Sequence, residues 1–153
     1  MMIGQHRIFA DHYQFYVFDS KSDPHDINEE WSEEVIKKGY LQGLSSIHIV
    51  TIGDYNDHAV SIHAGSPEKT LSEGDHEVFT DIVIKSGKVK LSSPAYSNEE
   101  EPEYEIGKGA FKLTIRSLNI GIEDPDAIEE LEDIDFFKLK HLERYELYFQ
   151  KKT

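Results

Sequence analysis

Histidine and carboxylate side chains are the groups in this chain that could do chemistry, because the sequence contains no cysteine. His48, His58, His63 and His76 lie near one another in the sequence. In an extended strand His58 and His63 would point to opposite faces, and no H-E-x-x-H or H-x-H spacing occurs. We therefore expect surface or hydrogen-bonded histidines, with no metal site and no bound cofactor.

The remaining motifs do not indicate catalysis. The run Asp124-Pro125-Asp126 could open a calcium loop, but an EF-hand needs an oxygen ligand at its fifth position and glycine at its sixth, where Ile128 and Glu129 stand. Gly107-Lys108-Gly109 lacks the phosphate-loop pattern, and no serine occupies G-x-S-x-G. Carboxylate pairs are too abundant to identify a general acid and base. We predict that the protein is not an enzyme.

Charge is the most informative property of the composition. Thirty acidic residues against sixteen basic ones give a formal net charge of −14. Such a surface repels nucleic acid and anionic membranes and favours a basic partner, although net charge also serves solubility alone. Two acidic clusters stand out as candidate partner-binding loops, and a row of carboxylates can imitate the phosphates of a nucleic acid. Their residues are Glu99, Glu100, Glu101, Glu103, Asp124, Asp126, Glu129, Glu130, Glu132, Asp133 and Asp135.

A short helix over residues 32–39 is the best-marked element. Ser32 suits the N-cap, acidic residues follow it, two lysines end the helix, and Gly39 can leave it in a left-handed conformation. About two turns are marginal alone. We therefore expect Trp31, Val35, Ile36 and Tyr40 to pack onto a sheet, with Trp31 and Ile36 paired as a hydrophobic staple.

Alternating or aromatic-rich segments predict about seven strands. They cover residues 13–19, 46–52, 58–64, 77–84, 89–91, 110–116 and 141–150. Residues 46–64 look like a hairpin, because a turn cluster separates two alternating segments. We predict a single domain, residues 1–153, folded as an antiparallel β-sandwich with one short helix near the N-terminus; a partly open barrel is the alternative.

The N-terminal segment lacks the apolar core of a signal peptide, and no apolar run approaches the ~20 residues of a membrane-spanning helix. We expect a soluble cytoplasmic protein without membrane insertion, which a partner could recruit to the membrane.

One family resemblance emerges from the residues of the first strand and the helix. The order Tyr13-x-Phe15-x-Val17-Phe18, a polar loop, and Trp31-Ser32-x-Glu34-x-Ile36-x-Lys38-Gly39-Tyr40 resembles the competence protein J family. Residues 46–49 and 60–62 lie where that family also has strands. Gly107-Lys108-Gly109-x-Phe111-x-Leu113-Thr114 is similar to its later Lys-Gly-Asp-Tyr-x-Leu-Thr segment, with Ala110 and Phe111 in place of Asp and Tyr.

The best-known member of that family inhibits the DNA-entry nuclease of bacterial competence. The resemblance implies a small acidic bacterial protein that binds and inhibits a basic nuclease and does not bind nucleic acid itself. The helix motif carries the strongest match, and its residues cap and pack, so we assign it to the fold and the acidic loops to the interface. The alternative is a β-sandwich module that binds a small ligand or calcium.

Overall fold

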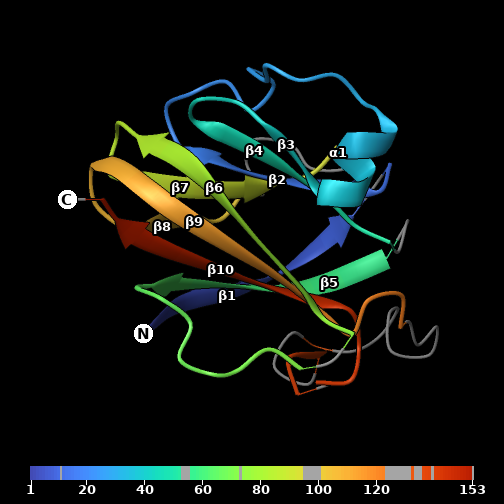
Figure 1. The fold of residues 1–153 in the computed structure, drawn as a ribbon. Helices are drawn as coiled ribbons and strands as arrows, with labels where there is room; N and C mark the ends of the chain where they lie inside the picture. The colour runs from blue at the N-terminus through green and yellow to red at the C-terminus, as the bar shows by residue number, and fades with distance from the viewer. Residues whose placement is uncertain are drawn as a thin grey trace.

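Among the residues that a computed structural model of the chain describes, ten strands form two five-stranded sheets. The structure describes residues 1–10, 12–52, 56–72, 74–94, 101–122, 132, 136–138 and 140–152. The first sheet has the order β1 (Met2–Ala10), β5 (Asn56–Ala64), β10 (Arg144–Lys151), β9 (Gly109–Leu118), β6 (His76–Ile84). The second has the order β3 (Tyr40–Gln42), β4 (Ser46–Val50), β2 (Gln14–Asp19), β7 (Lys88–Ser92), β8 (Glu103–Glu105). The two sheets pack face to face (Figure 1).

The predicted fold class is confirmed: the described residues are mainly β, with two sheets and one short helix. They form ten strands where the sequence indicated about seven, because β1, β3 and β8 lack clear alternation or are very short. Neighbouring strands are antiparallel except β5 and β10, which run parallel with Tyr145 opposite Val60 and Leu147 opposite Ile62.

The core between the sheets follows the alternation that predicts the strands. Phe15 and Val17 of β2 face Leu147 and Tyr145 of β10 in one buried cluster, and the Phe15 and Tyr145 rings meet edge to face with centroids 5.2 Å apart. Burying such a side chain stabilises the fold by about 1.5–3 kcal/mol. β2 is buried on both faces, as its apolar sequence predicts.

The predicted hairpin over residues 46–64 is wrong. β4 belongs to the second sheet and pairs with β2 and β3, whereas β5 belongs to the first sheet and pairs with β1 and β10. Alternation fixes which face of a strand is buried but not which strand lies beside it. Two strands on opposite layers of a sandwich therefore give the same pattern as a hairpin.

The predicted helix is confirmed as α1 (Glu33–Lys38), which lies at the end of the sandwich opposite the two termini (Figure 1). The Ser32 hydroxyl accepts a hydrogen bond from the Val35 backbone N–H at 3.2 Å, and Gly39 has φ 94°. The Val50 N–H donates to the Gly39 carbonyl at 2.9 Å, which fastens the end of the helix to β4.

The predicted packing of this helix is only partly correct. Val35 is buried and Tyr40 is half-buried, but Trp31 and Ile36 are exposed. Successive residues of a helix point about 100° apart, so a helix of two turns that buries Val35 turns Ile36 outward. Trp31 precedes the N-cap and lies beside Ile36 at the surface.

Candidate partner-binding surface

The structure describes three of the eleven predicted contact residues, namely Glu101, Glu103 and Glu132. Glu103 and Glu132 are exposed and Glu101 is half-buried. The other eight lie outside the described residues: Glu99, Glu100, Asp124, Asp126, Glu129, Glu130, Asp133 and Asp135. The structure therefore does not test whether the two acidic clusters come together.

Glu103 lies on β8, the edge strand of the second sheet, where its carboxylate is 3.5 Å from the Lys88 ammonium group. In the strand register Glu103 stands opposite Lys90, and Glu105 opposite Lys88. Opposite charges across a strand pair stabilise the pairing modestly. Part of the first acidic cluster is thus balanced by lysines of β7.

A group of apolar side chains is exposed around α1, and we call it the α1 surface: Tyr13, Trp31, Ile36, Ile52 and Ile120. Tyr13 is 53%, Trp31 48%, Ile36 57% and Ile52 56% exposed. A hollow of about 480 Å³ is lined by Tyr13, Trp31, Ile36 and Ile52, among others. A second, of about 320 Å³, is lined by Ile36, Ile52 and Ile120 with neighbouring polar residues. Ile36 and Ile52 border both, so the two hollows are neighbours that meet at these side chains.

The turn that carries Tyr13 onto this surface has an unusual backbone. His12 and Tyr13 are consecutive non-glycine residues with φ of 55° and 59°. The left-handed region costs an ordinary L-residue roughly 1–2 kcal/mol. A hydrogen bond from the Thr51 N–H to the Tyr13 carbonyl, at 2.9 Å, holds the turn against β4.

A buried polar network lies at the same end of the sandwich. The Glu143 carboxylate accepts hydrogen bonds from the Tyr145 hydroxyl and the Gly121 N–H, both at 2.8 Å, and lies 3.5 Å from His58 Nε2. Burial raises the pKa of the Tyr145 hydroxyl well above its usual value, and the neighbouring Glu143 carboxylate raises it further. The Glu143 N–H also donates to the Ile122 carbonyl. The network thus fixes the segment that carries Ile120 beside α1.

The sequence predicts surface or hydrogen-bonded histidines, and three of the four singled out have a ring nitrogen within hydrogen-bonding distance of a partner. His48 Nε2 lies 2.6 Å from the Pro24 carbonyl, and His63 Nε2 lies 2.8 Å from the Ser61 hydroxyl. His58 points into the interior, while His63 stacks on Tyr148 at the outer face, which confirms the predicted opposite orientations. Burial lowers the pKa values of His48 and His63. Within the part of the chain that the structure describes, no three His, Asp or Glu side chains are grouped so that they could hold a metal ion.

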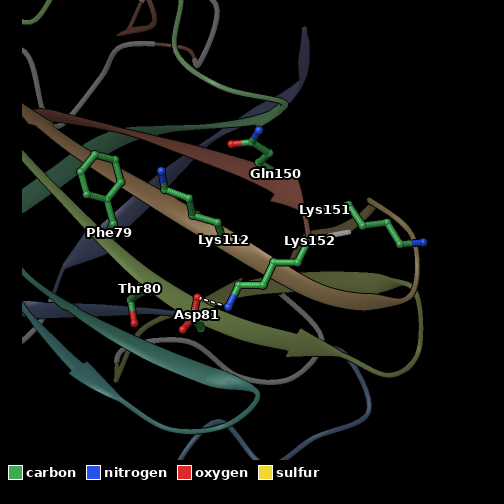
Figure 2. A pocket seen from close by; sticks show the side chains of 7 residues that line it. All are labelled: Phe79, Thr80, Asp81, Lys112, Gln150, Lys151 and Lys152. Atoms are coloured by element: carbon green, nitrogen blue, oxygen red, sulfur yellow. Dashed lines mark ion pairs between the residues drawn. The ribbon is translucent and has the colours of Figure 1, made fainter.

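Lysines surround a third hollow, of about 660 Å³, on the outer face of the first sheet (Figure 2). Lys152 forms an ion pair with Asp81 at 2.5 Å, and the Lys112 ammonium lies 4.2 Å from the centroid of the Phe79 ring. The Lys151 side chain points away from those of Lys112 and Lys152 (Figure 2). Two of the three lysines therefore already interact within the chain, which leaves no concentrated positive site for an anion.

Comparison with known proteins relates this geometry to a solved structure. No protein-family model and no curated protein matches the chain. The crystal structure of ComJ, inhibitor of the DNA degrading activity of NucA, from Bacillus subtilis, is similar with a TM-score of 0.73 and 16% sequence identity, covering 99% of this chain and 98% of that chain. This chain has the ComJ fold. The resemblance to the competence protein J family is thereby confirmed at the level of fold.

A second solved structure, described as Crocagin biosynthetic gene J, is similar with a TM-score of 0.57 and 9% identity, covering 94% of each chain. This likeness, at so low an identity, concerns the fold alone. Among the described residues, no helix is long and apolar enough to cross a membrane.

Sequence reasoning missed the α1 surface and the Glu143 network, although each had a signal. Adjacent Val35 and Ile36 on so short a helix cannot both face the core. Alternation with Tyr145, Leu147 and Phe149 placed Glu143 on the inner face of the last strand, where a carboxylate requires buried partners. His58, its partner, is 85 residues away in the sequence.

Proposed function

We propose that this protein binds a nuclease and inhibits its degradation of DNA, and that it acts by occupying the enzyme and not by catalysis. The observation that carries the proposal is the likeness to ComJ over nearly the whole of both chains. ComJ is an inhibitor of the DNA degrading activity of NucA, and a fold shared from end to end presents its surfaces in a comparable arrangement.

Charge supports the same function. A protein with a net charge of −14 attracts a nuclease whose DNA-binding surface is basic, and it repels the DNA that the nuclease would otherwise hold. Opposite charges on the two proteins accelerate association and favour the correct partner. The bound inhibitor then denies DNA access to the enzyme.

The first test is a DNA-degradation assay with the NucA-type nuclease of the source organism, at rising concentrations of this protein and at low salt. We expect activity to fall to zero at an excess of inhibitor, and the inhibition to weaken as salt screens the charges. Full activity at every concentration would refute the proposed function.

The two acidic clusters remain the proposed binding surface, and their charge would attract the basic nuclease from a distance. Replacing Glu129, Glu130, Glu132 and Asp133 together by lysine should slow association. The matched control makes the same change of charge at four exposed positions elsewhere in the chain, Asp23, Asp26, Glu68 and Asp81. If both variants associate equally slowly, overall charge and not the acidic segment governs the encounter.

A further inference from the structure

We propose that the α1 surface is the place where the nuclease docks, with an apolar protrusion of the basic enzyme filling the two hollows beside α1; this docking presupposes the nuclease inhibition proposed above. The acidic clusters would then steer the encounter, and the contacts of Tyr13, Trp31, Ile36, Ile52 and Ile120 would hold the complex.

The concentration of exposed apolar side chains is the first reason. Ten large apolar side chains are exposed among the described residues, and five of them form the α1 surface. Scattered exposed apolar residues need no explanation, whereas a contiguous group marks an interaction site. Trp and Tyr are also the residues most enriched at the energetic centres of interfaces, and Trp31 is the only tryptophan of the chain.

The backbone at Tyr13 is the second reason. Two consecutive left-handed residues cost stability in the free protein, and such strain persists where the conformation serves a function. Here the conformation carries an aromatic ring to the rim of an apolar hollow, beside Trp31. The ring is thus held in place before the partner arrives, which lowers the entropy lost on binding.

Charge at the rim identifies the partner as basic. Three acidic side chains close to Trp31 in the sequence are exposed, namely Glu30, Glu33 and Glu34. One lysine side chain in the same segment is exposed, Lys37. The charge of Lys38 is taken up by Glu29, whose carboxylate lies 2.7 Å away.

The same rim disfavours a second copy of this chain as the occupant. In a symmetric dimer over the α1 surface, identical acidic rims would face each other and repel. A basic enzyme meets the apolar centre and the acidic rim with complementary groups. Neither terminus interferes, because both lie at the opposite end of the sandwich (Figure 1).

The test compares variants of the α1 surface with matched controls in the DNA-degradation assay, using the NucA-type nuclease of the source organism. Trp31→Ala and Ile36→Ala remove exposed side chains and leave the Ser32 cap and Val35 in place. Phe79→Ala and Leu44→Ala remove side chains of similar exposure elsewhere on the molecule. Circular dichroism and melting temperature confirm that each variant is folded.

We expect Trp31→Ala to raise the inhibition constant by about 10- to 30-fold, as loss of an interface hot spot does, and Trp31→Phe to restore part of the affinity. Ile36→Ala should raise it less, and the controls should match wild type. The increase should persist at high salt, because the lost contact is apolar.

The outcomes separate the two claims. If wild type inhibits and the α1 variants inhibit equally well, the docking site is refuted and the nuclease inhibition stands. If wild type does not inhibit, both fail. If Ile36→Asp converts a wild-type dimer to a monomer while inhibition is unchanged, a second copy occupies the α1 surface and the inference is overturned.

Discussion

Replacing Glu143 by alanine should strongly destabilise the fold, because the Glu143 carboxylate is buried and accepts two short hydrogen bonds. Its donors are the Gly121 N–H and the Tyr145 hydroxyl, each at 2.8 Å. A buried donor left without an acceptor costs about 1–3 kcal/mol. The two donors together therefore give a loss of about 2–6 kcal/mol in the free energy of unfolding.

Urea denaturation followed by circular dichroism measures this loss directly. For a chain of this size each kcal/mol lowers the melting temperature by about 2–4 °C, so the variant should melt at least about 4 °C below wild type. Glu146→Ala is the matched control, because Glu146 is a half-buried carboxylate on the outer face of β10 that accepts a hydrogen bond from the Tyr148 hydroxyl at 3.1 Å. We expect the control to lose about 1 kcal/mol or less.

A double variant tests the cause. In Glu143→Ala with Tyr145→Phe, the hydroxyl that alanine would leave unpaired is absent, so the combined loss should be smaller than the sum of the single losses by about 1–2 kcal/mol. A Glu143→Ala protein within about 1 kcal/mol of wild type would refute the reasoning, since the carboxylate would then contribute no more than a surface group.

Three further predictions follow from the same structure. Trp31 fluorescence should be readily quenched by acrylamide in the free protein, because the ring is half exposed; emission that resists quenching would mean that Trp31 is covered. The free energy of unfolding should fall as pH drops below about 6.5, because burial lowers the pKa values of His48 and His63 and the unfolded chain then binds protons that the folded chain does not. His48→Gln, which keeps a donor for the Pro24 carbonyl, should reduce this slope in denaturation curves measured from pH 7 down to 5, and an unchanged slope would exclude His48 as a source. Asp19→Ala should lower the free energy of unfolding by about 2–3 kcal/mol, because Asp19 is buried and accepts bonds from the Ser86 N–H and hydroxyl; an unchanged melting temperature would contradict this.

Local rules in the sequence predict local structure well. Ser32 and Gly39 define the ends of α1 because caps act within a few residues of chain. Alternation locates most strands and even predicts that Glu143, directly before β10, points inward, because side chains in a strand reverse sides at every residue.

Such local rules do not predict which strands and side chains pair across the molecule. The hairpin over residues 46–64 is a wrong prediction because strand partners are chosen by the packing of both sheets together. The meeting of His58 with Glu143 depends on β5 lying parallel to β10, which no local pattern encodes. Trp31 shows the same limit for the proposed docking site. A tryptophan side chain suggests burial, but Trp31 lies at the surface because the core beneath α1 is already filled by other side chains.

Inhibition of DNA degradation is the most direct test of the central claim. A fixed amount of the NucA-type nuclease is titrated with this protein at low salt, and the remaining DNA is measured. The account predicts that degradation stops once the inhibitor is in excess, and that Trp31→Ala shifts the curve to higher concentration while Phe79→Ala does not. Undiminished degradation at every concentration of the wild-type protein would contradict it.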